Sequence, residues 1–574
     1  MKLDLNLFYK AAFWVSLIGI FVFIADFGFT NSENSDRFFH SYYFIVLFFG
    51  LTSTLLRYKE HGWNIKRKVL VFDAASILFT VIVIGFYFFS STGVHWQLMK
   101  LAVFLTFIRE YSDLKINFKR TFLNPAQLFV LSFLVLIFVG ALLLSLPNAT
   151  HQGIPFIDAF FTSTSAVCVT GLAVVDTGSY FTVFGQVIIM GLIQIGGLGI
   201  LTFASYFSYF FKGGTSFENQ LTLGDLTNSK MLGDVFSILK YVILITFTIE
   251  LFSAVLIFTS LEPGAFSTFS EKAFFAAFHA VSSFCNAGFS TMPLGAYEIS
   301  YRFNYYFQLI LIFTFVLGGL GFPIVSNLLK YFKYKLSTFF KNKKSTGYKP
   351  WVLSLNSRIA LITAFILTVV GFFGFYFLEY NNTLAEHGAF GKVVTALFGA
   401  TTPRTAGFNS IDNASMTYPT LMLVIFLMWI GASPSSTGGG IKTSTFAIAT
   451  MNIISLARGK TRIELYRREV SDLSVRRAFA IISLSLIVIG FGIMFILVFD
   501  PSLTLMDVAF ECFSAYSTVG LSLGITGALT VQSKIVLCVI MFVGRVSMLS
   551  IIIAVFKKIK HKNYRYPTEE ITMN

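Results

Sequence analysis

The sequence has little charge for a chain of 574 residues. Only 12% of its residues are charged and 55% are hydrophobic, with a mean hydropathy of +0.74. A water-soluble surface of that size needs far more charge, so the chain belongs in a lipid bilayer. Acidic residues are the scarcer kind, 28 against 43 basic ones, and the basic residues occur in short clusters between apolar spans. That distribution is typical of cytoplasmic membrane loops and argues against a nucleic-acid partner.

Residues suited to metal, disulfide or enzyme chemistry are also few. The four cysteines, Cys168, Cys285, Cys512 and Cys538, lie in or beside apolar segments and lack metal-ligand spacing. The seven histidines are scattered, and neither a GxSxG sequence nor a phosphate-binding lysine motif is present. We therefore expect no covalently bound cofactor, and a membrane enzyme is the remote alternative. No small-residue cleavage site follows the first apolar span, which predicts a retained helix.

Long apolar runs, by contrast, are abundant. A helix crosses a bilayer with about 20 mostly apolar residues. Twelve candidate spans fall roughly at 10–29, 42–57, 68–89, 97–109, 126–146, 182–210, 236–260, 304–330, 358–379, 418–455, 474–499 and 532–556. Basic connectors near 57–68, 333–344 and 458–468 share one side, which the positive-inside tendency makes cytoplasmic. The even count puts both termini there too, in an all-α, multi-pass protein of the plasma membrane.

Four segments on the opposite side, 156–171, 270–288, 391–407 and 505–520, are too short and too polar to span. Aligned on their final glycines, they share a residue type at three positions. Ten residues before the glycine stand Phe161, Phe278, Leu397 and Phe510. Six residues before it stand Ser165, Ser282, Thr401 and Ser514, and directly after it stand Leu172, Phe289, Phe408 and Leu521. One glycine after an apolar run could simply end a short helix. Four in register indicate re-entrant loops around a pore, because irregular backbone at membrane depth must be buried or line a watery cavity.

The end of each loop is suited to binding a dehydrated cation. A short helix running inward points its partly negative C-terminus at the axis. The residues after it can turn their carbonyls inward and replace water, and glycine permits the positive φ that this needs. We call these stretches the filter strands: Cys168, Val169, Thr170, Gly171; Cys285, Asn286, Ala287, Gly288; Arg404, Thr405, Ala406, Gly407; and Ser517, Thr518, Val519, Gly520. A dehydrated cation is therefore the predicted ligand of this filter.

The filter strands and their flanks resemble the Trk/Ktr/HKT superfamily of potassium transporters, most closely its bacterial Ktr/Trk uptake subunits. The segments that carry the resemblance are TSAVCVTGLAVVDTG, HAVSSFCNAGF, TTPRTAGFNSID and FSAYSTVGL, with IQIGGLGI at 193–200 and LGGLGFP at 317–323. It covers about residues 122 to 560. It implies four helix, pore-loop, helix repeats in a pseudo-fourfold arrangement around one pore, at 122–212, 213–332, 333–457 and 458–560, followed by a tail at 561–574.

The resemblance also implies potassium uptake by a homodimer in contact with membrane lipid. No cytoplasmic segment of this chain is long enough to form a nucleotide-binding domain. Regulation is therefore expected from a separate cytosolic ring of nucleotide-binding subunits, as in the family. Glycine in all four filter strands favours potassium, since family members with serine in the first tend to pass sodium. Sodium-coupled or sodium-permeable transport within the superfamily is the alternative.

The apolar run after the third loop is interrupted by 431–442, GASPSSTGGGIK, which no straight helix accommodates. A broken helix with a structural role is one interpretation. The stretch also resembles the family's gating loop, which assigns gating to Gly438, Gly439, Gly440 and Lys442. Arg545, near the middle of the last span, should face the interior rather than lipid. It could pair with a buried carboxylate, but the family's arginine at this position projects beneath the filter, which implies an electrostatic barrier.

Two further features are harder to assign. Arg404 is expected to brace the third loop from behind by hydrogen bonding, and Cys168 and Cys285 stand where threonine or serine is commoner in the family. Residues 1–121 add about four helices that the resemblance does not cover. Asp73 and Lys100 lie within these apolar spans and could pair there. No helix carries basic residues at every third position, which argues against a voltage sensor, so a packing or dimer-stabilising role is expected.

Overall fold

The computed structural model describes residues 5–29, 33–61, 67–89, 94–113, 125–199, 235–340 except 263 and 265, and 353–555. The longer helices are α1 (Leu5–Gly28), α2 (Glu33–His61), α3 (Arg67–Phe89), α4 (Val94–Asp113), α5 (Pro125–Leu144), α6 (Phe156–Cys168), α8 (Val183–Leu198), α11 (Val235–Ser260), α12 (Phe269–Phe284), α14 (Tyr305–Leu320), α15 (Phe322–Phe340), α16 (Leu355–Glu379), α17 (Ala389–Thr401), α18 (Tyr418–Trp429), α19 (Thr443–Ala457), α20 (Asp472–Phe499), α21 (Leu505–Ser517), α22 (Val531–Val546) and α23 (Met548–Val555). The expected tail at 561–574 lies outside the described residues.

Short elements complete the described part of the chain. They are α7 (Thr177–Tyr180), α13 (Ile299–Arg302), the 3-10 turns η1 (Pro147–Ala149), η3 (Gly295–Tyr297), η4 (Asn413–Ser415) and η5 (Thr526–Ala528), and the antiparallel strands β1 (Glu464–Leu465) and β2 (Arg468–Glu469). The architecture is therefore all-α, as the sequence predicts.

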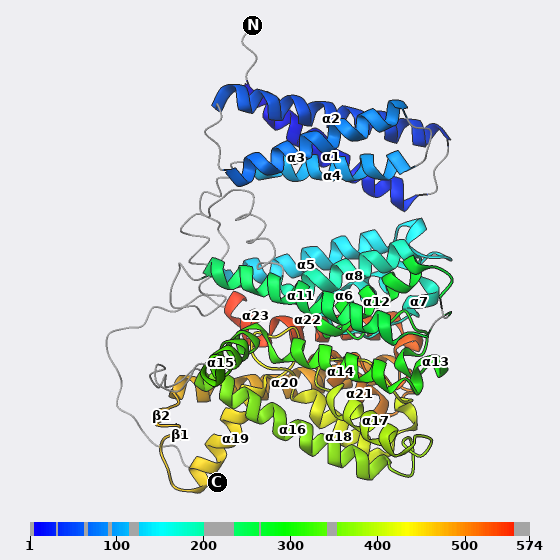
Figure 1. Ribbon diagram of the computed structural model, residues 1–574. Coiled ribbons are helices and arrows are strands. Elements are labelled where there is room, and N and C mark those ends of the chain that lie inside the picture. The colour runs from blue at the N-terminus through cyan, green and yellow to red at the C-terminus, as the bar shows by residue number, and fades with distance from the viewer. Residues whose placement is uncertain are drawn as a thin grey trace.

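Helices α1 to α4 form a bundle of their own, set apart from the rest of the helices (Figure 1). Tyr43, Leu47 and Met99 are fully buried at its centre. In the described residues it meets the core at one corner, where the Asn148 side-chain amide donates to the carbonyls of Phe27 and Phe29, both at 3.0 Å. The bundle therefore has a core separate from that of the pore repeats.

Ion pairs inside this bundle replace the pair expected from the sequence. They are Lys100–Asp26 (2.8 Å), Arg109–Asp73 (2.5 Å) and Arg57–Glu110 (2.5 Å). The expectation that Asp73 pairs with Lys100 is wrong. Helices α3 and α4 follow each other as a hairpin, so Asp73 near the start of α3 lies beside the end of α4. Lys100 is nine residues from that point, about 13 Å along the helix at ~1.5 Å per residue.

Most of the remaining helices repeat one unit four times: a helix of 20–28 residues, a re-entrant helix and a third helix of 12–16 residues. The units are α5, α6, α8; α11, α12, α14; α16, α17, α18; and α20, α21, α22. The re-entrant helices, which we call pore helices, are α6, α12, α17 and α21, and they coincide with the four predicted re-entrant segments. Two begin at threonine caps, where Thr268 and Thr504 accept the backbone N–H of Glu271 and Asp507 at 3.2 Å.

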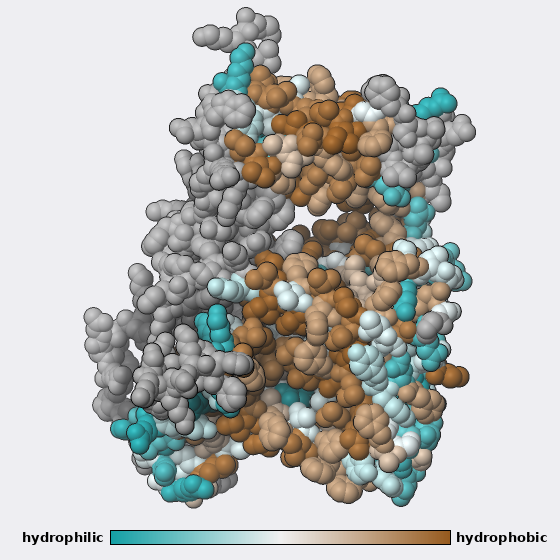
Figure 2. All heavy atoms as spheres, viewed as in Figure 1, coloured by the Kyte–Doolittle hydropathy of each residue, from teal (hydrophilic) through white to brown (hydrophobic). Residues whose placement is uncertain are grey.

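The pore helices lie at the centre of the core, and the long helices around them expose apolar side chains. The pore-helix residues Phe161, Phe278 and Phe510 are 0% exposed, whereas Phe365 on α16 and Val498 on α20 are 70% and 67% exposed. An apolar belt runs down the visible face, with hydrophilic residues beside it, mainly at the right and the lower left (Figure 2). In the described residues, six helices are long and apolar enough to cross a membrane, or seven when α14 and α15 count as one bent span.

Three of the predicted spans are broken rather than straight. Helices α14 and α15 meet at 105° across Gly321, α18 and α19 flank the interrupted segment, and α22 ends before Ser547, which has a φ of +73°. The expected single helices at 304–330 and 532–556 are thus wrong in shape. Gly321 has a φ of +81° and lies against the carbonyls of Pro434 and Ser435, so the first bend fits around the interrupted segment. The predicted span at 182–210 is described only to residue 199.

Candidate functional site

The four pore-loop glycines meet at one place in the molecule. A Cβ atom added to Gly171 would lie 3.0 Å from the Cα of Gly288, and one on Gly288 would lie 3.0 Å from the Cα of Gly407. A Cβ on Gly520 would lie 2.9 Å from the Cα of Gly171. The glycines therefore form a ring in chain order, so that repeat one faces repeat three and repeat two faces repeat four. No larger residue fits this ring without displacing backbone.

Backbone carbonyls lie directly against these glycines. The oxygens of Ala287, Ala406, Val519 and Thr170 are next to the Cα atoms of Gly171, Gly288, Gly407 and Gly520, respectively. Each oxygen belongs to the repeat that follows around the ring. The arrangement concentrates carbonyl dipoles from four separate chain segments in one narrow place.

The four filter strands share an unusual backbone conformation. The glycines have φ values of +91°, +69°, +77° and +92°, and the residues two positions earlier, Val169, Asn286, Thr405 and Thr518, have +59°, +58°, +76° and +51°. Non-glycine residues rarely adopt positive φ, and β-branched ones such as Val169 and Thr518 do so at a cost. The same costly turn in all four repeats indicates that the ring geometry requires it.

Side-chain hydroxyls on the pore helices brace the strands. Ser165 Oγ accepts from the Gly171 N–H at 3.0 Å, and Ser514 Oγ accepts from the Gly520 N–H at 3.1 Å. In the second repeat Ser282 donates instead to the Phe289 carbonyl at 2.6 Å. Polar groups predicted from their shared spacing thus act as hydrogen-bonding partners of the filter strands.

The third loop is one residue shorter than the others, which the alignment on glycine misses. Thr402, not Thr401, donates to the Phe408 carbonyl at 2.5 Å, and the Ala406 N–H bonds the carbonyl four residues back rather than five. Thr401 bonds Leu397 within its own helix, and Phe398 rather than Leu397 is the fully buried phenylalanine. The predicted equivalence of Leu397 and Thr401 with the other repeats is therefore wrong by one position.

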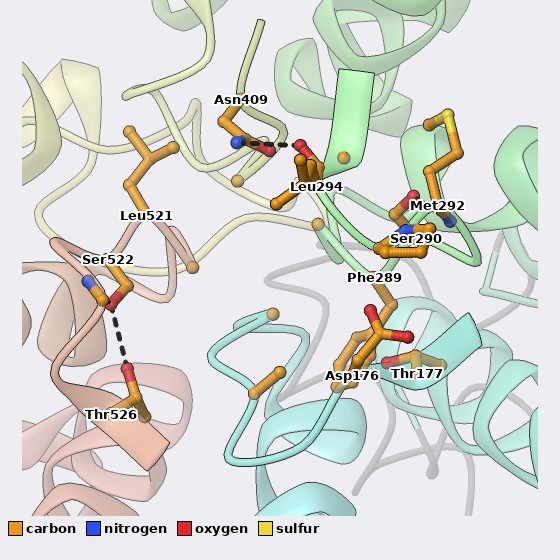
Figure 3. A pocket seen from close by; sticks show the side chains of 18 of the residues that line it. Asp176, Thr177, Phe289, Ser290, Met292, Leu294, Asn409, Leu521, Ser522 and Thr526 are labelled. Atoms are coloured by element: carbon orange, nitrogen blue, oxygen red, sulfur yellow. Dashed lines mark hydrogen bonds between the residues drawn. The ribbon is translucent and has the colours of Figure 1, made fainter. Parts of the chain in front are cut away.

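A vestibule opens above the glycine ring. It has a volume of about 380 Å³ and is lined by all four ring glycines together with residues that follow each filter strand. Asp176, Ser290, Asn409 and Ser522 surround it (Figure 3). At ~30 Å³ per water, the space holds on the order of ten waters, enough for a hydrated ion. Burial, and secondarily the nearby Asp176 carboxylate, raise the pKa of Glu298, and Asp176 itself places an acidic side chain in the vestibule wall.

Two side chains at the first filter position, those of Cys285 and Arg404, point away from the ring. Cys285 Sγ lies 3.9 Å from Gln194 Oε1 and 4.0 Å from Glu250 Oε1. Arg404 donates to the Ala364 carbonyl at 3.0 Å and to Thr368 at 3.2 Å, both on α16. The guanidinium thus lies behind the loop, as expected of a brace.

Side chains two positions before the glycines contact the interrupted segment, which the sequence did not indicate. Thr437 donates to Asn286 Oδ1 at 3.1 Å, and the Gly439 N–H donates to Thr518 Oγ1 at 2.9 Å. Asn286 in turn donates to Thr405 Oγ1 at 3.3 Å. Residues 430–442, which we call the intramembrane loop, are therefore hydrogen-bonded to two of the four filter strands and linked through Asn286 to a third, on the side away from the vestibule.

Two basic side chains lie at this loop. Arg545 donates to the carbonyls of Thr437 and Gly196, and Lys442 donates to that of Gly438. Arg545 therefore joins the loop to α8 from the end of α22, not from mid-helix as predicted. The carboxylate of Glu250 accepts from Gln194 at 3.0 Å, so the described contacts of Arg545 are to carbonyls.

Carbonyl oxygens and helix C-termini are the ligands that this site offers. Among the described residues, no group of three or more His, Cys, Asp or Glu side chains could hold a metal ion. Rings of carbonyl oxygens next to the partly negative C-termini of helices suit a weakly hydrated monovalent cation rather than a tightly held divalent one. The geometry is therefore suited to a membrane protein that transports monovalent cations.

Comparisons with known proteins agree with that class. The model of the TrkH family, described as cation transport protein, matches residues 96–566. Ktr system potassium uptake protein B of Bacillus subtilis is 38% identical, over 78% of this chain and 96% of that protein. Potassium/sodium uptake protein NtpJ of Enterococcus hirae is 34% identical, over 79% and 97%. The crystal structure of the potassium transporter TrkH from Vibrio parahaemolyticus matches with a TM-score of 0.61 at 18% identity, over 85% and 97%.

This chain is a membrane transport protein and not an enzyme. It belongs to the TrkH family of cation transport proteins, within the Trk/Ktr superfamily. The resemblance seen in the sequence is therefore confirmed, and the shared fold extends over most of the chain.

Proposed function

We propose that this protein takes up potassium through the glycine ring, with backbone carbonyls of the filter strands replacing the ion's water. The observation that carries the proposal is the fourfold recurrence of one positive-φ turn around glycines in mutual contact. The relatives named potassium uptake proteins support the choice of ion. The vestibule would admit the hydrated ion, and the negative mouth near Asp176 would favour cations.

Sodium-coupled or sodium-permeable transport is the second candidate. It is raised by the relative named potassium/sodium uptake protein. Glycine at Gly171, the first ring position, favours potassium because a serine side chain there would meet the backbone of the second repeat.

The intramembrane loop is proposed as the gate. Its residues Gly438, Gly439 and Gly440 lie against side chains of the third and fourth filter strands. Lys442 and Arg545 hold its carbonyls and place positive charge beneath the ring. An ion leaving the ring away from the vestibule would meet this barrier, so the loop must move for transport.

Regulation is proposed to come from a cytosolic ring of nucleotide-binding subunits docked on a homodimer in the plasma membrane. Support comes from the relatives' names, which refer to a Ktr system. The helix end and hairpin on the side away from the vestibule expose basic residues, including Lys330, Lys333, Arg458 and Arg468. That face would be cytoplasmic, together with both termini.

Potassium uptake by cells that lack their own uptake systems tests the proposal. Expression of the parent chain should restore growth at low potassium. Gly171→Ser should lose about tenfold or more of the preference for potassium over sodium, because the added side chain displaces ring backbone. Gly153→Ser is the matched control, since Gly153 has a φ of +78° but no atom near its Cβ position. Unchanged preference in Gly171→Ser, or no uptake by the parent, would contradict the filter assignment.

A further inference from the structure

A buried carboxylate lies directly behind the vestibule wall of the fourth repeat. Glu511 on pore helix α21 is 0% exposed and accepts hydrogen bonds from the hydroxyls of Ser522 and, at 3.1 Å, Thr526. Ser522 stands two residues after the ring glycine Gly520. Ser522 and Thr526 line the vestibule and lie 3.0 Å apart (Figure 3). Glu511 thus ties the outer end of the filter strand to its own pore helix.

The second repeat contains the same connection made with a histidine. His279 on α12 is 0% exposed, and its Nε2 lies 3.1 Å from the hydroxyl of Ser290, two residues after Gly288. His279 and Glu511 each follow the fully buried phenylalanine of their pore helix. The N–H two residues after each serine donates back to it, from Met292 to Ser290 at 2.9 Å and from Gly524 to Ser522 at 2.8 Å. The two networks are equivalent in register and in bonding.

The direction of the serine hydroxyl is the same in both. The Phe275 carbonyl, 2.9 Å from His279 Nδ1, can only accept, so Nδ1 carries the proton. In the neutral ring Nε2 is then an acceptor, and the Ser290 hydroxyl donates to it. Glu511 likewise accepts from Ser522. Each hydroxyl hydrogen therefore points into the protein, which leaves a serine oxygen lone pair free to face the vestibule.

The other two repeats have no such connection among the described residues. In the first, Thr162 bonds the Asp158 carbonyl of its own helix at 2.8 Å, and Ala173 stands at the serine position. In the third, the equivalent pore-helix position is Gly399, which has no side chain, and Asn409 bonds the Leu294 carbonyl at 3.2 Å. Because repeats two and four face each other across the ring, the two connections are diagonally opposed.

We propose that His279 and Glu511 are positioning residues for ion selection, which hold Ser290 and Ser522 so that two opposite filter strands are fixed at their outer ends. The inference rests on the proposed filter. A ring that selects by replacing water needs its oxygens at set distances, and a strand free at its outer end can relax around a smaller ion. Holding the filter strands of repeats two and four in place is enough to set the width of the ring between these two repeats.

Serine variants test the proposal with little disturbance to packing, because both serines are only half-buried. Ser522→Ala and Ser290→Ala should each lower the ratio of sodium to potassium KM about tenfold, the value of one hydrogen bond to a charged or buried polar group. Maximum uptake rate should stay within about twofold. Ser522→Thr and Ser290→Thr keep the hydroxyl and should restore the ratio. Thr162→Val, which removes the hydroxyl at the equivalent position of repeat one, should leave it unchanged.

Pore-helix variants provide the second arm. Glu511→Gln retains an acceptor oxygen and should keep the ratio within about threefold, whereas Glu511→Leu should reproduce Ser522→Ala without adding to it in the double variant. An unchanged KM ratio in both serine-to-alanine variants overturns the inference. If the parent prefers potassium and Gly171→Ser abolishes that preference, unchanged KM ratios in the serine variants contradict only the role of the Ser290 and Ser522 hydrogen bonds. A parent without potassium preference would instead contradict the filter itself.

Discussion

At the scale of single residues, buried polar groups are held neutral or paired by their surroundings. His387, in the connection between α16 and α17 on the vestibule side, is 3% exposed, and its Nδ1 lies 3.1 Å from the Tyr305 hydroxyl. Burial, with Arg302 and Lys392 nearby, lowers the pKa of His387 below its usual range. Nε2 has no hydrogen-bond partner in the described structure, and the Glu386 carboxylate 3.8 Å away is already paired with Arg302, so a second proton on the ring gains little.

That lowered pKa predicts a pH dependence of stability. Above about pH 6.5 His387 is neutral in both the folded and unfolded states. As pH falls below that value the unfolded state binds a proton that the folded state does not, so stability decreases by up to ~1.4 kcal/mol per pH unit. Thermal unfolding of purified protein between pH 7.5 and 5 measures this. His387→Gln should flatten the dependence and the exposed-site control His151→Gln should not; equal slopes in all three proteins would contradict the assignment.

At the scale of elements, only a few hydrogen bonds tie the intramembrane loop to the rest of the molecule, and they come from several separate segments. It contacts the filter strands through Thr437 and Gly439, and it is tied to α8 through Arg545. Its Ser433 N–H bonds the Gly319 carbonyl at 3.0 Å beside the bend of α14 and α15. A small movement of any of these helices would therefore be transmitted to the loop.

Shortening this loop should open the pathway. Deletion of residues 438–440 removes the segment beneath the ring and should raise potassium flux several-fold, measured as uptake rate per molecule in the membrane. Arg545→Gln is the milder variant, expected to raise flux about twofold to tenfold by removing a positive charge from the ion's path. Arg476→Gln makes the same charge change at an exposed site on α20 and is the control. No change in flux in either pathway variant would exclude a gating role for the loop.

At the scale of the whole molecule, the N-terminal bundle and the pore core are separately packed units (Figure 1). The family match begins at residue 96 and so includes only α4 of the bundle. The bundle's ion pairs are internal to it, and Phe27 stacks on Phe184 of the core with ring centres 5.9 Å apart. The described contacts reach the core at Asn148 and Phe184, which are outside the filter strands.

Removal of residues 1–113 should therefore spare ion selection. We expect the potassium KM of the truncated chain to stay within about twofold, with a thermal midpoint lower by a few degrees because the contacts at Asn148 and Phe184 are lost. Uptake assays and thermal unfolding of both forms check this. Asp73→Asn in the full chain is the control: it should destabilise the bundle by leaving Arg109 without its carboxylate. A large change in KM on truncation would instead assign the bundle a regulatory role.

Much of this architecture could be predicted from local pattern. The apolar spans, the pore-helix bounds and the ring glycines follow from residues close together in sequence, because hydropathy, helix termination and positive φ are local properties. The alignment failed at Thr401 and Leu397 because glycine was its only fixed point, and a one-residue deletion in the third loop is visible only in the bonds of Thr402. The breaks at Gly321 and Ser547 were not predicted, because the hydropathy of an apolar segment is the same whether its helix is straight or bent.

The sequence by itself determined that this chain spans a membrane and carries four copies of one glycine-ended turn. Only the tertiary structure decided which copies are neighbours, where Lys100 and Asp73 find their partners, and that Asn286, Thr405 and Thr518 face the intramembrane loop. It alone showed that Glu511 and His279 occupy equivalent positions. The reason is physical: side-chain direction depends on backbone dihedrals, and contacts between segments 100 residues apart are set by packing of the whole bundle rather than by any local pattern.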